Sequence, residues 1–154
     1  MKQRLAHIAI AVRDLEESCT FFRESFGWSL GKIETVRSEQ VRVAFLRAGD
    51  CSIELISPTG PESPVARFLE KRGEGLHHIA LWVPNLSEAI GRLRERGIRP
   101  VSDQPRTGSE GCPIQFLHPR DTRGTLIELK EIPPPPVLSP QGGRGDMSAG
   151  QAGS

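Results

Sequence analysis

One internal repeat constrains the fold of this chain more than any other feature. Residues 7–17 (HIAIAVRDLEE) and residues 78–88 (HIALWVPNLSE) both begin with a histidine inside an alternating, strand-like pattern. Each repeat then reaches Asp14 or Asn85, and a glutamate follows three residues later, which is the pattern of a capping box at a helix start. Both repeats are therefore expected to open with a strand that leads into a helix.

Further elements are predicted in matching order in the two halves of the chain. Helices are expected over residues 15–26 and 86–96, because a glycine suited to a helix C-terminus follows each apolar pattern. Strand patterns in the first half cover residues 28–36, 41–46 and 52–56. Those in the second half cover residues 98–101, 114–117 and 124–129. Each half is thus β-α-β-β-β, and residues 63–72 predict a linker helix between the halves.

The length of the chain, 154 residues, suits one domain built from two small halves that share a core. Neither half has enough sheet to bury its helix alone. The predicted fold class is α+β, with two tandem β-α-β-β-β modules forming one curved mixed sheet. We expect a domain over residues 4–131, with modules at about 4–57 and 75–131. Residues 133–154 are rich in Pro and Gly and contain no aromatic residue, which predicts a disordered tail.

Net charge and cysteine content argue against several classes of function. The 20 Lys and Arg residues nearly balance 19 Asp and Glu residues, so no strong field attracts nucleic acid or an anionic membrane. No apolar stretch approaches the roughly 20 residues that span a bilayer. The three cysteines form no Cys-x-x-Cys pair, and the first residues do not resemble a signal peptide. We expect a soluble cytoplasmic protein that binds neither nucleic acid nor a membrane.

Strand alternation places two histidines and two glutamates on one face of the sheet. His7 and His78 lie opposite the Ile, Leu and Val residues that a covering helix would bury. Glu54 follows His7 by 47 residues, Glu128 follows His78 by 50, and each glutamate lies between two apolar strand residues. The four side chains are therefore expected to converge across a pseudo-twofold axis.

A divalent metal ion explains this convergence. Two neutral imidazoles and two carboxylates balance a charge of 2+ and leave positions open for water or substrate. A lone histidine or glutamate in a strand is more often structural, but here the pair is repeated at equivalent sites. The sequence predicts that His7, Glu54, His78 and Glu128 bind one divalent ion, such as Co, Mn, Ni, Zn or Mg.

The residues around these positions resemble the vicinal oxygen chelate superfamily and, within it, the methylmalonyl-CoA epimerase family. The resemblance covers about residues 4–131. The HIAIAV and Asp14-Leu15-Glu16 stretch is common to the whole superfamily. More particular to the epimerase family are SPVARFLEKRGEGLHHIA at 63–80 and FLHP at 116–119, which runs on to LIEL at 126–129.

This resemblance implies an epimerase that interconverts the (R) and (S) forms of methylmalonyl-CoA by removing and returning the α-proton through an enolate. It places the metal ligands at His7, Glu54, His78 and Glu128. It also implies that Glu128 is one proton-transfer base, and the pseudo-symmetric Glu54 is the available candidate for the other. Some members carry Gln where this chain has Glu54. Some carry a catalytic Glu on the third strand, where this chain has Val43.

Two other functions are compatible with the sequence. A glyoxalase I type isomerase (lactoylglutathione lyase) uses the same ligand set, and a small-molecule-binding protein of the same fold needs no metal. The expected partners are methylmalonyl-CoA or a related acyl-CoA and a second copy of the chain in a homodimer. The loop at 105–111 could bring backbone N–H groups or Arg106 to the acyl carboxylate, although a loop of this composition is often only a turn. His77 is expected to point away from His78 and to pack locally, and His118 to have a local structural role.

Overall fold

The computed structural model describes residues 3–136, so residues 137–154, most of the predicted tail, lie outside the described part of the chain. Pro133–Pro136 are exposed and have no regular structure. The first half consists of β1 (Arg4–Ala11), α1 (Leu15–Phe26), β2 (Ser29–Val36), a 3-10 turn (Arg37–Glu39), β3 (Val41–Ala48) and β4 (Cys51–Pro58). The predicted β-α-β-β-β order of this half is confirmed.

The second half repeats this order after the linker helix α2 (Pro64–Arg72). Its elements are β5 (Gly75–Val83), α3 (Leu86–Glu95), β6 (Arg106–Thr107), a 3-10 turn (Ser109–Gly111), β7 (Pro113–Leu117) and β8 (Ile127–Glu131). Asp14 and Asn85 cap α1 and α3 as predicted, since their side chains accept hydrogen bonds from the backbone N–H groups of Glu17 and Glu88. No helix within residues 3–136 is long and apolar enough to cross a membrane.

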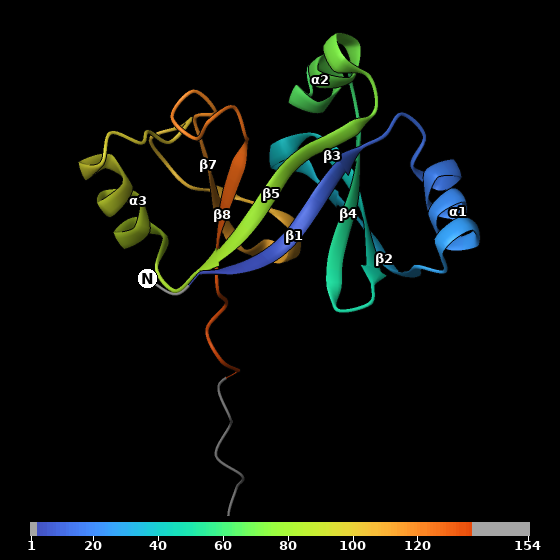
Figure 1. Cartoon of the computed structure of the whole chain (residues 1–154), viewed down its shortest axis with the longest axis horizontal. Coiled ribbons are helices and arrows are strands. Elements are labelled where there is room, and N and C mark those ends of the chain that lie inside the picture. The colour runs from blue at the N-terminus through green and yellow to red at the C-terminus, as the bar shows by residue number, and fades with distance from the viewer. Residues whose placement is uncertain (1–2, 137–154) are drawn as a thin grey trace, which may run out of the picture.

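The eight strands within residues 3–136 form one curved mixed sheet in the order β2-β3-β4-β1-β5-β8-β7-β6 (Figure 1). The first strands of the two halves, β1 and β5, pair antiparallel at its centre, and each pairs with the last strand of its own half in parallel. Ile8 lies opposite Ile79, its equivalent in the repeat. The pseudo-twofold axis therefore passes through this pair, which confirms the predicted joining of the two modules.

The two faces of the sheet are covered differently. Leu15 and Cys19 of α1 pack against Leu55 and other apolar residues of β3 and β4, and α3 packs in the same way on the second half. Figure 1 shows α1 and α3 on opposite flanks of the molecule, with α2 between them. On the other face, Val65 and Leu69 of α2 pack with small and branched residues of β1, β3 and β4. This leaves part of that face free for a cavity.

Two predicted strands of the second half were misplaced. The strand expected at residues 98–101 is reduced to a single bridge between Pro100 and Leu117, and the short edge strand lies at β6 instead. Pairing does not extend toward α3 because the backbone N–H of Arg99 donates to the Asp121 side chain and that of Ile98 donates to the Leu93 carbonyl. The last strand begins at Ile127 rather than at Gly124, because residues 119–125 form hydrogen-bonded turns in which Gly124 has a φ of 83°.

Candidate metal centre and cavity

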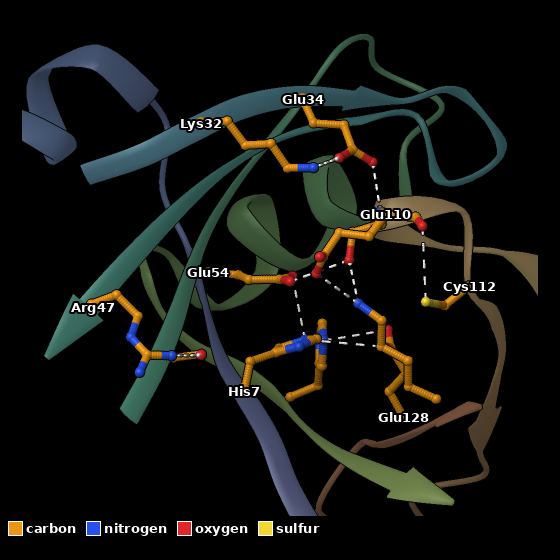
Figure 2. Close-up of polar contacts among 12 residues, drawn as sticks. His7, Lys32, Glu34, Arg47, Glu54, Glu110, Cys112 and Glu128 are labelled. Atoms are coloured by element: carbon orange, nitrogen blue, oxygen red, sulfur yellow. Dashed lines mark hydrogen bonds and ion pairs between the residues drawn. The ribbon is translucent and has the colours of Figure 1, made fainter. Parts of the chain in front are cut away.

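The four residues predicted as metal ligands come together on the face of the sheet opposite α1 and α3. They lie on the four central strands: His7 on β1, Glu54 on β4, His78 on β5 and Glu128 on β8. All four are buried. Figure 2 shows His7, Glu54 and Glu128 pointing toward one another from separate strands. The convergence follows from the topology, because each glutamate strand is the parallel neighbour of a histidine strand.

The distances within this group are short. His7 Nε2 lies 3.1 Å from His78 Nε2 and 3.3 Å from Glu54 Oε2. Glu128 places one oxygen 3.5 Å from His78 Nε2 and the other 3.9 Å from His7 Nε2. Ligand atoms of His7, His78 and Glu128 all lie within 4.8 Å of one another, so these residues could hold a metal ion.

Backbone irregularities accompany both histidines. Ala9 pairs with His78 but Ile10 pairs with Leu76, so His77 is an extra residue on β5. The same shift on β1 leaves Ala6, the residue before His7, as an extra residue. Both irregularities are β-bulges, and a bulge can re-aim the neighbouring side chain.

The bulge on β5 explains why the prediction that His77 points away from His78 is wrong. Strict alternation fails at a bulge, and His77 Nδ1 lies 2.9 Å from His78 Nδ1. The His77 ring also packs edge-on against Phe68 of α2, with ring centroids 4.8 Å apart. His77 thus lies between α2 and His78 and contacts both.

Burial controls the charges of the group. Desolvation lowers the pKa of His7 to about 3, with a smaller effect from the positive charge of Lys130, and it lowers the pKa of His78 well below 6.5. Both imidazoles are therefore neutral at neutral pH. Desolvation, with a smaller contribution from the nearby charge of Glu54, raises the pKa of Glu128 to about 8. The pKa of Glu54 is raised to about 7 by burial, although Lys130 and Ser109 act in the opposite direction.

The donor set fits a divalent ion. Nitrogen and oxygen ligands bind such an ion at about 2.1 Å, so neighbouring ligands around a shared ion lie roughly 3 to 3.5 Å apart. Three of the four measured separations fall in this range. A cation would also favour the ionised carboxylates that burial disfavours. His7, Glu54, His78 and Glu128 thus have the chemistry and spacing of a divalent metal site.

A cavity of about 770 Å³ opens next to this group. Glu54, His78 and Glu128 line it, as do apolar side chains that include Val36, Val41, Val43, Ile56, Phe68 and Phe116. Three cations of α2 line another part of its wall: Arg67, Lys71 and Arg72. The cavity thus combines apolar walls with a few polar groups, which is the usual composition of a small-molecule site, and its α2 side carries positive charge.

The structure also places Arg106, Val43 and His118, the other residues that the sequence analysis singled out. Arg106 lines the cavity with its side chain half exposed, and Arg106 Nη1 lies 3.7 Å from Glu39 Oε1. Val43 is buried and lines the cavity, so a side chain at this position of the third strand does face the site. His118 lies in a turn, where its Nδ1 accepts from the backbone N–H of Arg120. That contact agrees with the local structural role expected for His118.

Two further residues of the site were not predicted. Lys130 lies two residues after Glu128 and is only 1% exposed, and its Nζ donates to Ser109 Oγ at 2.9 Å. Ser109 Oγ in turn donates to Glu54 Oε1 at 3.2 Å. Alternation along β8 could have placed Lys130 on the face of Glu128. Nothing in the sequence indicated that the loop before β7 brings Ser109 to Glu54.

Comparison with known proteins shows the family. Residues 6–116 match the family model described as "Glyoxalase/Bleomycin resistance protein/Dioxygenase superfamily". The chain belongs to this superfamily. That assignment agrees with the resemblance noted in the sequence and with the paired β-α-β-β-β modules of the fold.

Several known proteins are similar to this chain over most of its length. The mitochondrial methylmalonyl-CoA epimerase of Mus musculus is 38% identical over 129 residues, which cover 83% of this chain and 72% of the mouse protein. The ethylmalonyl-CoA/methylmalonyl-CoA epimerase of Cereibacter sphaeroides is 40% identical over 131 residues, covering 84% and 98%. A methylmalonyl-CoA epimerase solved with methylmalonyl-CoA and NH4+ superposes with a TM-score of 0.80 at 36% identity, covering 85% and 95%.

Proposed function

We propose that this protein is an epimerase that interconverts the (R) and (S) forms of methylmalonyl-CoA by removing and returning the α-proton. The observation that carries the proposal is the convergence of two histidines and two glutamates beside a cavity. Relatives at 38% and 40% identity named methylmalonyl-CoA epimerase support it, as does the similar structure that contains methylmalonyl-CoA.

The residues that hold the metal are His7, Glu54, His78 and Glu128. A divalent ion bound there supplies positive charge that stabilises the negative charge developing on the acyl oxygens as the α-proton leaves. The two neutral histidines provide lone pairs without a proton to displace.

Glu128 and Glu54 are the proposed proton-transfer bases. Epimerisation needs one base on each face of the α-carbon. Glu128 on β8 and Glu54 on β4 approach from opposite sides of the central β1–β5 pair, across the pseudo-twofold axis. Burial raises the pKa values of both carboxyl groups in the metal-free protein, and a bound cation would lower them toward the ionised form that accepts a proton. Val43 leaves the third strand without a base, as the sequence indicated.

The remaining wall of the cavity suits an acyl-CoA. The α2 cations Arg67, Lys71 and Arg72 match the phosphate groups of CoA in charge. Phe68 and Phe116 provide apolar surface beside the site for the acyl-pantetheine arm. The substrate is thus proposed to lie with its acyl end at the two glutamates and its phosphates toward α2.

The test is an isotope experiment with one stereoisomer of methylmalonyl-CoA. Metal-replete protein in D2O should incorporate deuterium at the α-carbon while the two isomers approach equal amounts. Glu128→Gln should slow both events by at least about two orders of magnitude, because it removes a general base while keeping nearly the same shape. Glu95→Gln makes the same chemical change on the exposed side of α3 and should leave both rates unchanged.

Two outcomes would contradict the proposal. If metal-replete protein leaves a single isomer unchanged and unlabelled, the activity is different, and a glutathione hemithioacetal assay tests the glyoxalase I alternative. If the purified protein binds no divalent metal, the metal-free binding protein becomes the better reading. A homodimer, a cytoplasmic location and a functional domain bounded by residues 4–131 stay predictions.

A further inference from the structure

Lys130 is a charged side chain in the interior of the protein. It is 1% exposed, and its Nζ lies 5.1 Å from the centre of the Trp82 ring. The carboxylate of Glu110 lies 3.4 Å from Nζ, but the Glu110 side chain is 48% exposed. Burying an ammonium group costs free energy unless the group is paired, so we looked for the interactions that compensate for the burial of Lys130.

The hydrogen bonds of Lys130 lead to the candidate metal centre. An ammonium has only donors, so Ser109 Oγ accepts from Lys130 Nζ and uses its single proton to donate to Glu54 Oε1. Glu54 Oε1 is thereby occupied, and Oε2 is the oxygen that lies 3.3 Å from His7 Nε2. The chain of contacts thus assigns the two oxygens of Glu54 to different partners.

The loop that carries Ser109 is held by other contacts. The backbone N–H of Glu110 donates to Glu34 on β2, at 2.9 Å, and Figure 2 shows Glu34 and Glu110 bridging the loop and the first half of the sheet. Lys130 itself does not line the cavity, whereas Glu54 and Ser109 do. A direct contact between Lys130 and the substrate is therefore not its role.

We infer that Lys130 is a positioning residue. Through Ser109 it holds the Glu54 carboxylate so that a single oxygen, Oε2, faces the metal site. This inference rests on the metal site of the proposed function. The ammonium also offsets one of two buried carboxylates, Glu54 and Glu128, which would otherwise repel each other. Lys130 and Ser109 thus keep Glu54 Oε2 turned toward His7 and lower the cost of its charge.

The test measures metal binding rather than turnover. Full-length protein is titrated with Co²⁺, and both the dissociation constant and the Co²⁺ absorption spectrum are recorded. Lys130→Met and Ser109→Ala should each weaken Co²⁺ binding roughly 10- to 100-fold, the range typical for loss of a group that orients a ligand. Arg23→Met removes a positive charge from the exposed surface of α1, outside the cavity and without contacting Ser109, and should leave Co²⁺ binding unchanged.

A double-mutant cycle separates this role from a general structural one. Since Lys130 acts through Glu54, Lys130→Met should change Co²⁺ affinity much less in a Glu54→Gln background than in the wild type. Methionine keeps a chain of similar length but removes the charge that offsets the buried carboxylates, so the thermal midpoint of the metal-free protein should fall, and Co²⁺ affinity is compared at a temperature where each variant is folded. If Lys130→Met does not fold, the same cycle with Ser109→Ala and Glu54→Gln tests the link.

The outcomes distinguish this inference from the proposed function. Wild-type affinity and spectrum in both Lys130→Met and Ser109→Ala would overturn the positioning role while leaving the metal site intact. An equal loss of affinity in the wild-type and Glu54→Gln backgrounds would overturn the action through Glu54. If the wild-type protein does not bind Co²⁺, the metal site fails, and the inference fails with it.

Discussion

A methyl group added at Gly108 tests how tightly the loop beside the metal centre is packed. Gly108 directly precedes Ser109 and lines the cavity. Its φ of −92° and ψ of −162° are accessible to any residue, so Gly108→Ala causes no backbone strain. A Cβ at this position would, however, lie 2.7 Å from Ile114 Cγ2 and 2.9 Å from Ile114 Cδ1. The perturbation is therefore one of packing alone.

The magnitude follows from the surroundings of Ile114. Ordinary contacts begin near 3.4 Å, so the loop and Ile114 must separate by several tenths of an ångström. Ile114 is 2% exposed and cannot swing into solvent. Overpacking of this kind costs about 1–3 kcal/mol, which corresponds to a Tm lower by roughly 4–12 °C for a domain of this size. Displacement of Ser109 should also weaken its hydrogen bond to Glu54 and reduce metal affinity.

Thermal unfolding by circular dichroism and Co²⁺ titration measure both effects. Gly60→Ala is the matched control, because nothing lies within 4 Å of a Cβ there, and it should lower neither the Tm nor the metal affinity. A Tm and a Co²⁺ affinity in Gly108→Ala equal to those of the wild type would show that the loop accommodates the methyl group. That result would refute the argument that close packing on Ile114 fixes Ser109.

Two further predictions concern the metal site and a surface ion pair. His78→Ala should lower the bound metal per chain, measured by elemental analysis, with little change in circular dichroism; full metal occupancy would remove His78 from the ligand set. Hydrogen bonds from the Arg99 side chain and backbone lower the pKa of Asp121 from 3.8 to about 2, so the stabilisation is present above pH 3.8 and is lost as the pH falls through 2. The Tm difference between Asp121→Asn and the wild type should therefore narrow over this range, and a constant difference would contradict the assigned cause.

Local patterns were enough to predict the repeated order of elements and the ligand face. The capping residues Asp14 and Asn85 mark where each helix begins, and these signals depend only on neighbouring residues. Strand alternation likewise placed His7 and Glu54 on one face, because the side-chain period of a strand is a local property. Duplication of the pattern then predicted that the two halves meet around one centre, as the pairing of β1 with β5 shows.

Only the tertiary structure decided the features that depend on register between distant segments. The bulge that turns His77 toward His78 arises from pairing with β1, about 70 residues away in the chain, and no local pattern reveals which residue is extra. The contact of Ser109 with Glu54 joins a loop of one half to a strand of the other. The sequence pattern around Lys130 is that of an ordinary polar strand residue, and only the packing of the fold buries it. Local sequence determines which face a side chain takes, whereas long-range packing determines which partner it meets there.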